Sequence, residues 1–481
     1  MANLFDKALK IGYNLYITRI RKRILEHTRE KLSSRLGFIF LSAGCAIGLG
    51  NIWRFPYITG RYGGGAFVLI YLFFLVVLGI PVVVMEYSIG RRSQRSIARA
   101  FDVLEKKGQK WHLFSYAAMA GNYLLVMFYT TISGWMLAYF LKMVSGSFAG
   151  LDQAGVADTF SALQQDPIQS VLFMAAIILI GIVICSLGLQ NGVERITKIM
   201  MTCLLAVMLL LVVRSVTLPN ALEGLKFYLI PDFDKLREAG IYNAIYAAMG
   251  QACFTLSAGM GGMMIFGSYL DKKRTLGGEA LNVMLLDTFV AITAGLIIFP
   301  ACFAYGVPAD QGPGLVFVTL PNIFNAMPFG TLWGSLFFIF MNFAAITTIV
   351  AVFENIMAFS MDLFHWTRKR ACIVNFVLIT LLSIPCALGF SILSGIQPFG
   401  AGSAILDLED FLVSNVIMPL GAVLIILFCT TKRGWGWQHF IEEANTGKGF
   451  HFPQWTRFYI SYVLPCAVLF IFIMGIIDKF A

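Results

Sequence analysis

Residues 43–54 read AGCAIGLGNIWR, so three glycines and a polar asparagine interrupt an otherwise apolar stretch. Apolar sequence flanks this run on both sides, which would put the glycines at membrane depth. An unpaired backbone group costs several kcal/mol in hydrocarbon, and a broken helix is tolerated there only where it is buried in protein or lines a cavity. Such a break is typical of a binding site. The competing interpretation is close helix packing through small residues.

The composition defines the class of protein. Of the 481 residues, 58% are hydrophobic and only 13% are charged, which is far more apolar than a soluble domain of this length. A membrane-spanning helix needs about 20 apolar residues, and this rule predicts about eleven spans. Their centres fall near residues 48, 78, 128, 178, 203, 255, 290, 347, 382, 418 and 467. We therefore expect an all-α integral membrane protein built as one bundle.

The basic residues are sorted by side of the membrane. A formal net charge of +10 could indicate nucleic-acid binding, but the Lys and Arg residues cluster at alternate ends of the spans instead. The clusters lie within residues 19–35, 91–99, 272–274 and 368–370. By the positive-inside rule the amino terminus is cytoplasmic, and with an odd number of spans the carboxyl terminus is extracellular. No nucleic-acid partner is expected.

The amino-terminal segment bears on the location of the protein. The first 30 residues lack an apolar core ending in a small-residue cleavage site, and no Asn-x-Ser/Thr sequon occurs. We expect the plasma (inner) membrane of a prokaryote, with membrane lipid as the surroundings. Apolar residues of the segment 1–36 recur at helical spacing, which fits an amphipathic helix on the membrane surface. An ordinary solvated tail fits equally well.

A second hydrophobic span is interrupted in the same way. Residues 250–262 read GQACFTLSAGMGG, in the fifth span after the first. Two Gly-interrupted helices at corresponding places in two halves of a chain indicate an inverted repeat with a site near the middle of the membrane. The sequence therefore predicts a transporter.

Polar side chains inside other spans supply candidate ligands. Asp287 is an acidic residue within the seventh span, and an intramembrane carboxylate is by default an ion ligand or a proton carrier. A structural, hydrogen-bonded carboxylate is the alternative. Thr347 and Thr348 place two adjacent hydroxyls in the middle of the eighth span, although Thr often bonds back to its own helix.

Together these groups favour sodium and a solute that carries a carboxylate. The amino termini of half-helices point unpaired N–H groups toward the break, which favours an anionic ligand group. Freed carbonyls, Thr hydroxyls, the amide of Asn51 and the carboxylate of Asp287 form the oxygen shell of a small hard cation, with too little charge to require a divalent ion. No Gly-x-x-x-x-Gly-Lys-Ser/Thr motif occurs, so ATP is not expected to drive transport.

The run AIGLGNIWRFPY at residues 46–57 is followed by GGGAF at 63–67 and GIP at 79–81. These motifs resemble the neurotransmitter:sodium symporter family, in its bacterial amino-acid transporter branch, and the similarity covers roughly residues 29–478. The resemblance implies a five-plus-five inverted-repeat transporter fold with eleven transmembrane helices, the first and sixth unwound at mid-membrane. Its parts would be a cytoplasmic segment (1–36), a first five-helix repeat (37–213), an extracellular loop (214–240), a second five-helix repeat (241–431), a cytoplasmic loop (432–456) and the eleventh helix with the extracellular carboxyl terminus (457–481).

The resemblance also implies a set of site residues. The amino-acid substrate would meet backbone groups and hydroxyls at the two breaks and an apolar side-chain pocket, formed by Ala46, Leu49, Gly50, Leu125, Tyr129, Phe254, Thr255, Ser257, Met260, Thr348 and Val352. Sodium site one would use Ala46, Asn51, Thr255 and Asp287 together with the substrate carboxylate. Sodium site two would use Gly44, Ile47, Ala344, Thr347 and Thr348. Arg54 with Asp410 resembles an outer gate, and Arg29 with Tyr269 and Asp362 resembles an inner latch. A carboxylate shared with sodium would couple the two ligands.

Departures from the family pattern narrow the expected substrate. Family members that carry monoamines have an Asp where this chain has Gly48, so the substrate here must bring its own carboxylate, as an amino acid does. The implied pocket holds no charged group, which favours hydrophobic or aromatic amino acids. Asp287 puts a fixed negative charge where chloride-dependent members bind the anion, so transport independent of chloride is expected.

Other classes of protein stay open or are set aside. A proton-coupled amino-acid exchanger of related architecture would share the broken helices, and a sensor that binds an amino acid without transporting it would share the binding residues. An enzyme is not expected, because the five histidines all fall near the ends of spans rather than beside a nucleophile. The preferred amino acid, the sodium stoichiometry and the oligomeric state are not predicted.

Overall fold

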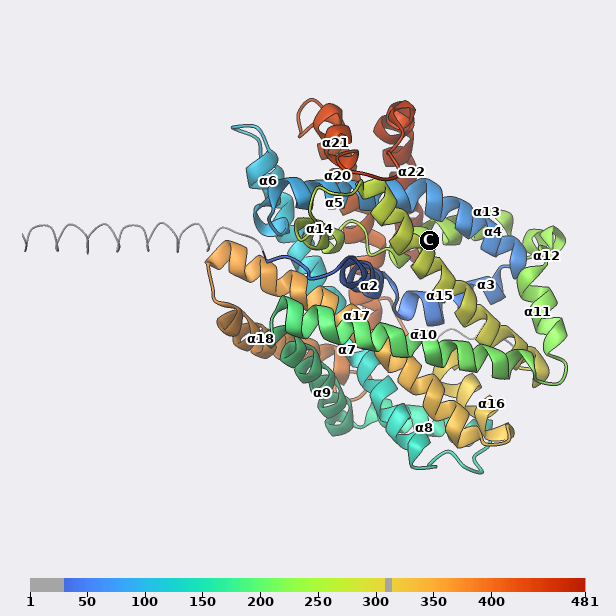
Figure 1. Ribbon diagram of the computed structural model, residues 1–481. Coiled ribbons are helices and arrows are strands. Elements are labelled where there is room, and N and C mark those ends of the chain that lie inside the picture. Colours follow the sequence, from blue (N-terminus) through green and yellow to red (C-terminus); the bar gives the residue numbers. More distant parts are fainter. Residues whose placement is uncertain (1–29, 308–313, 481) are drawn as a thin grey trace, which may run out of the picture. The chain divides into compact units, whose positions relative to one another are not determined.

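The computed structural model describes residues 30–307 and 314–480 (Figure 1). In these residues the structure is helical, and β-type pairing is limited to two isolated bridges. The chain divides into two units, residues 1–31 and residues 32–481. Most of the segment expected as an amphipathic helix or a solvated tail, residues 1–29, lies outside the described residues.

Most of the described chain is helical. Those of the first half are α2 (Arg35–Ala46), α3 (Phe55–Arg61), α4 (Gly65–Phe74), α5 (Ile80–Ser93), α6 (Ile97–Leu104), α7 (Phe114–Val144), α8 (Gln153–Gln165), α9 (Pro167–Ser186), α10 (Arg195–Val216), α11 (Ala221–Leu229) and α12 (Phe233–Glu238). Those of the second half are α13 (Ile241–Thr255), α14 (Gly262–Ser268), α15 (Leu276–Ala304), α16 (Leu320–Ala326), α17 (Gly330–Phe364), α18 (Arg368–Leu388), α19 (Ile405–Phe411), α20 (Met418–Thr430), α21 (Trp437–Ala444) and α22 (Leu464–Phe480).

The expected spans correspond to these helices. Among the described residues, nine segments are long and apolar enough to cross a membrane, and two of them combine two helices joined by a short π-helical turn. The pair of segments 35–46 and 50–61 passes the same test as one span bent by 57°. The interrupted segment of α13 and α14 falls where the sixth span is expected, although neither piece is long enough to cross a membrane alone. The all-α membrane fold is thus confirmed.

Helix starts are set by side-chain caps. Ser34 accepts a hydrogen bond from the N–H of Gly37 at the start of α2, and Asp152, Asp166, Asp232 and Thr367 cap later helices in the same way. Such a cap satisfies one of the N–H groups that have no partner inside the helix. At α12, the N–H of Lys235 donates to Asp232, and this bond holds the pKa of that exposed carboxyl below its usual value.

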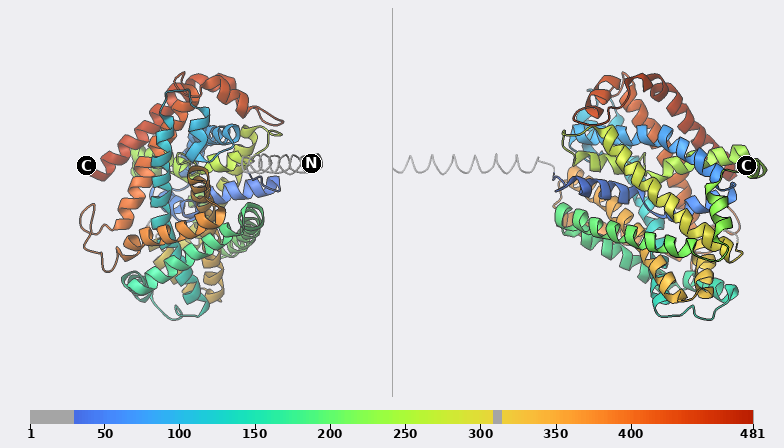
Figure 2. Two further views of the ribbon diagram at one scale, coloured as in Figure 1. Left: turned by 90° about the vertical axis from the view of Figure 1, so that its left-hand side faces the viewer. Right: turned by 45° about the vertical axis from the view of Figure 1, so that its right-hand side comes forward.

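The broken helix α2 lies between long helices. Helix α2 packs against α10, α15 and α17. Helix α17 in turn packs along α7, and the labels α2, α10, α17 and α7 lie close together in Figure 1. The last helix, α22, lies at the edge of the bundle (Figure 2), and only a third of its most apolar window is buried. The most buried of the nine segments are those of α17 and α7, which pack against each other.

Several short helices were not predicted from the sequence. The segment expected as an outer loop at residues 214–240 contains α11 and α12, and α8 and α16 occur in two other connections between spans. These helices are short, so packing on the bundle rather than intrinsic propensity has to stabilise them. A hydropathy pattern for spans cannot detect them.

Candidate functional site

The first break is shaped by a glycine against two hydroxyls. Helix α2 ends at Ala46, Ile47 has an extended ψ of 101°, and helical structure resumes in the π-turn Gly50–Arg54. A Cβ added at Gly48 would overlap the hydroxyl oxygen of Tyr129 and lie 2.8 Å from that of Thr348. Glycine is therefore required for the break to approach α7 and α17 this closely.

The second break depends on left-handed backbone conformations. Helix α13 ends at Thr255 and α14 begins at Gly262, and Ser257, Gly259 and Gly261 between them all have positive φ. The carboxylate of Glu86, which is fully buried, accepts the N–H groups of Gly259 (2.6 Å), Met263 (3.0 Å) and Met264 (3.2 Å). An acidic side chain from α5 thus satisfies the backbone groups that the break exposes. The sequence analysis did not assign this role to Glu86.

Two residues expected in sodium site one, Asn51 and Thr255, both donate hydrogen bonds to a third, Asp287. The amide nitrogen of Asn51 donates to the carboxylate of Asp287 over 2.8 Å and to its main-chain oxygen over 3.2 Å, and the hydroxyl of Thr255 donates to the same carboxylate over 3.1 Å. All three side chains are buried. Among the described residues, no cationic side chain pairs with Asp287. A buried carboxylate without a counter-charge is costly, so its donor set fits a monovalent cation.

The residues expected in sodium site two form a cluster of oxygen atoms. The hydroxyl of Thr348 lies 3.0 Å from the carbonyl oxygens of Gly44 and Ile47 and 3.2 Å from that of Ala344, and the hydroxyl of Thr347 donates to Ala344 over 2.9 Å. A hydroxyl carries one proton, so Thr348 can satisfy only one of these three carbonyls at a time. The surplus of acceptors in a buried site fits a small hard cation such as sodium.

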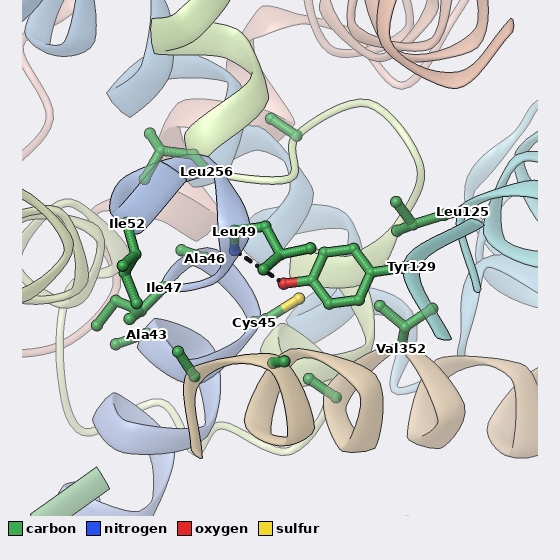
Figure 3. Close-up of a cluster of buried hydrophobic side chains, with 14 of the residues drawn as sticks. Ala43, Cys45, Ala46, Ile47, Leu49, Ile52, Leu125, Tyr129, Leu256 and Val352 are labelled. Carbon is green, nitrogen blue, oxygen red and sulfur yellow. Dashed lines mark hydrogen bonds between the residues drawn. The ribbon is translucent and has the colours of Figure 1, made fainter. Parts of the chain in front are cut away.

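Three of the residues expected to bind substrate, Leu49, Leu125 and Val352, lie beside Tyr129. The N–H of Leu49 donates to the Tyr129 hydroxyl over 3.0 Å, and the side chains of Leu125 and Val352 lie beside its ring (Figure 3). Ser257 donates to the carbonyl of Cys45 over 3.2 Å, which joins the two breaks directly. The remaining expected residues lie at the breaks themselves: Ala46, Gly50, Phe254, Thr255 and Met260.

The ion pair expected at the outer gate is not formed. The guanidinium of Arg54 lies over the ring of Phe254, 4.5 Å from its centroid, and forms no ion pair with Asp410, which accepts from Ser414. Arg29 lies outside the described residues. Asp362 accepts the N–H of Ser96 over 2.7 Å.

A buried ion pair lies beside the expected inner latch. The hydroxyl of Tyr269 donates to the carboxylate of Glu354 over 2.7 Å. The guanidinium of Arg368 donates two hydrogen bonds to the same carboxylate, over 2.7 and 3.0 Å. This pair was not predicted from the sequence. The signal was available, because Glu354 is an acidic residue within an apolar span, as Asp287 is.

A helix broken at mid-span, with carbonyl, hydroxyl, amide and carboxylate groups gathered at the break, defines the class of secondary transporters with discontinuous helices. The model of the sodium:neurotransmitter symporter family matches residues 29–151 and 162–480. The chain belongs to this family. It is a sodium-dependent membrane transporter and not an enzyme.

Individual relatives agree with this assignment. The chain is 38% identical to the uncharacterized sodium-dependent transporter YhdH of Bacillus subtilis, over 92% of this chain and 96% of that protein. It is 31% identical to an uncharacterized sodium-dependent transporter of Haemophilus influenzae, over 93% and 98%. Among solved structures, MhsT in complex with L-phenylalanine is 38% identical, with a TM-score of 0.82, over 93% of this chain and all of that one.

Proposed function

We propose that the protein is a sodium-coupled symporter that imports hydrophobic or aromatic L-amino acids by alternating access, with two sodium sites and without a need for chloride. Sodium site one would consist of Ala46, Asn51, Thr255 and Asp287, and site two of Gly44, Ile47, Ala344, Thr347 and Thr348. The five-helix repeats would comprise residues 37–213 and 241–431.

The observation that carries the proposal is the environment of Asp287. Its carboxylate is buried next to the first break, and its partners Asn51 and Thr255 are both neutral. A sodium ion would supply the missing positive charge, and a substrate carboxylate at the same break would supply a further ligand to the ion. Each ligand would then raise the affinity of the other, which is the physical basis of coupling. The fixed charge of Asp287 would replace chloride.

Two observations support an amino acid as the substrate. The close approach of Gly48 to the hydroxyls of Tyr129 and Thr348 leaves no space there for an acidic side chain, so the protein has no carboxylate at that point to pair with an amine. The similar transporter MhsT was solved with L-phenylalanine. The α-carboxylate would meet the N–H groups near Leu49 and Gly50 together with Tyr129.

The basic residues support an orientation with the amino terminus in the cytoplasm. Arg35 pairs with Glu279 at 3.0 Å, Arg91 donates to the carbonyl of Arg274 over 2.7 Å, and Arg95 pairs with Asp362 at 3.8 Å. These contacts join the segments that carry the basic clusters, so the clusters lie at one end of the bundle. By the positive-inside rule this end would face the cytoplasm of a prokaryote, and the carboxyl terminus would face out.

The test is equilibrium binding of radiolabelled leucine or tryptophan to the purified protein, in sodium and in potassium, with gluconate replacing chloride. We expect binding in sodium only. The change Asp287→Asn keeps the size of the side chain but removes its charge, and should weaken binding in sodium by roughly 5- to 150-fold, the usual range of coupling between two ligands. Asp234→Asn, at an exposed outer-loop residue, serves as the matched control and should bind normally.

The other outcomes identify the competing functions. Equal binding in sodium and potassium would contradict sodium coupling and favour a proton-coupled exchanger. Binding in sodium without counterflow of labelled amino acid in proteoliposomes would favour a sensor that does not transport.

A further inference from the structure

Two buried asparagines connect the second break to the helices of the expected substrate pocket. The amide nitrogen of Asn122, on α7, donates to the carbonyl of Met260 over 3.0 Å and to that of Ala118 over 2.8 Å. The amide nitrogen of Asn355, on α17, donates to the amide oxygen of Asn122 over 3.0 Å. Asn122 is 2% exposed and Asn355 is 0% exposed. The sequence analysis assigned neither of them to the site.

Helical register places both asparagines on the faces that carry the pocket. Asn122 precedes Leu125 by three residues and Tyr129 by seven, and residues at these spacings share one face of a helix. Asn355 follows Val352 by three residues and Thr348 by seven, on the helix that packs against α7. Seven residues correspond to about 10 Å along a helix. The amide pair therefore lies about two turns from the hydroxyls at the first break, just beyond Leu125 and Val352.

One hydrogen-bonding atom of this pair is unused. The amide oxygen of Asn355 has no hydrogen-bond partner within the described chain, whereas both amide nitrogens and the oxygen of Asn122 are engaged. A buried acceptor without a donor is unfavourable, because it has lost its hydrogen bonds to water. The unpartnered atom is an acceptor, so it suits an N–H or O–H group of a ligand.

We propose that the amide oxygen of Asn355 accepts a hydrogen bond from the far end of an aromatic substrate, the phenol O–H of tyrosine or the indole N–H of tryptophan, and thereby sets the preference of the transporter. This inference rests on the proposed function. An amino acid whose carboxylate is at Leu49 and Tyr129 directs its side chain past Leu125 and Val352 toward the amide pair. Leucine is too short to reach it, and phenylalanine reaches it without a donor. A site built to bond a substrate hydroxyl discriminates against the analogue that lacks it.

The first experiment compares substrates on the wild-type protein and needs no mutation. Unlabelled tyrosine and phenylalanine compete with labelled leucine for the purified full-length transporter in sodium, as do tryptophan and 1-methyltryptophan, in which the indole N–H is blocked. We expect tyrosine and tryptophan to bind about 10-fold more tightly than their partners, as one buried hydrogen bond allows. Equal affinity within each pair would overturn the proposal.

The second experiment assigns the preference to Asn355. The change Asn355→Leu removes the acceptor at similar volume, so the tyrosine-to-phenylalanine ratio should fall to about one while leucine still binds, which also reports that the variant is folded. Asn342→Leu is the matched control. Asn342 is buried on the same helix and its amide oxygen also lacks a partner among the described residues, but it precedes Thr348 by six residues and lies on another face.

The outcomes separate this inference from the proposed function. A ratio that persists in Asn355→Leu, or one that falls equally in Asn342→Leu, would overturn the assignment of specificity to Asn355. Failure of every amino acid to bind the wild-type protein in sodium would instead show that the proposed function is wrong.

Discussion

At the scale of single residues, the site depends on how closely backbone and side chains approach at the first break. Gly48 has no Cβ atom, and an added Cβ would push the first break away from the hydroxyls of Tyr129 and Thr348. Its neighbour Leu49 can then bring its N–H within 3.0 Å of the Tyr129 hydroxyl. Forcing an extra methyl group into a packed interior usually costs about 1–3 kcal/mol, and here the displaced groups are the expected ligands.

We predict that Gly48→Ala weakens sodium-dependent binding of labelled leucine by roughly 5- to 150-fold, the factor that corresponds to about 1–3 kcal/mol of overpacking. Saturation binding on the purified variant measures the change. Gly250→Ala is the control, because a Cβ added at Gly250 meets nothing within 4 Å. Equal weakening in both variants would mean that the effect comes from glycine in general and not from the contact with Tyr129.

Some residues of the candidate site could be predicted from the sequence and others could not. The break at Gly48 and the carboxylate of Asp287 were predictable, because a glycine run and an acidic residue are conspicuous within apolar spans. Asn355 was missed, since a lone asparagine in a buried helix carries no distinctive pattern. The available signal was the seven-residue spacing between Thr348 and Asn355. This spacing indicates a place near the pocket only when the packing of α7 against α17 is known.

At the scale of elements, the start of the broken helix is held by the turn before α10. The carboxylate of Glu194, whose side chain is fully buried, accepts the N–H and the hydroxyl of Ser33 at 2.7 Å and the hydroxyl of Ser34 at 2.9 Å. Lys198 lies 3.2 Å from it. Because Ser34 also caps α2, one acidic group positions the whole first half of the broken helix.

We predict that Glu194→Gln loosens residues 33–46. Hydrogen bonds to a charged group contribute about 1.5–3 kcal/mol each, so amide exchange of this segment should accelerate by roughly 10-fold or more. Hydrogen–deuterium exchange followed by mass spectrometry measures it. The exposed pair of Glu223 and Lys226 offers a control, since Glu223→Gln should leave the exchange of this segment as it is. Unchanged protection in Glu194→Gln would refute the role of this carboxylate.

The spans could be predicted at this scale, but the contacts between them could not. Hydropathy located the membrane-crossing segments, because each must be long and apolar irrespective of its neighbours. Glu194 contacts Ser33 across 161 positions of sequence, and no local pattern indicates that pairing. The outer-loop helices α11 and α12 were missed for a related reason, since their stability comes from the surface on which they lie.

At the scale of the whole molecule, the two ends of the bundle differ. At the end with the basic clusters, Glu194 holds α2 to α10 and Glu354 joins Tyr269 to Arg368. At the other end, Arg54 and Asp410 are not paired. Among the described residues, polar contacts join the segments at the end proposed as cytoplasmic, and the expected ion pair is not formed at the end proposed as extracellular.

We predict that sodium stabilises the whole protein. A ligand that binds only the folded state adds about 2.7 kcal/mol at a concentration 100 times its Kd, so the melting temperature should be several degrees higher in sodium than in potassium. Tryptophan fluorescence during heating measures it. Thr348→Val should abolish most of the difference by removing the hydroxyl from the oxygen cluster. Thr380→Val is the control, because that hydroxyl bonds only to its own helix. Identical melting in the two salts would argue against both sodium sites.

The contact at Gly48 also limits how this sequence could evolve. An acidic side chain at position 48, which a carrier of amines would need, overlaps the Tyr129 hydroxyl that Leu49 bonds. The replacement would have to be accompanied by a smaller residue or a moved helix on the side of α7. A lineage that started from this chain would therefore pass through intermediates that recognise neither a zwitterion nor an amine well. Selection would oppose the first step. The close contact that requires glycine at position 48 would thus act as an evolutionary barrier to such a change.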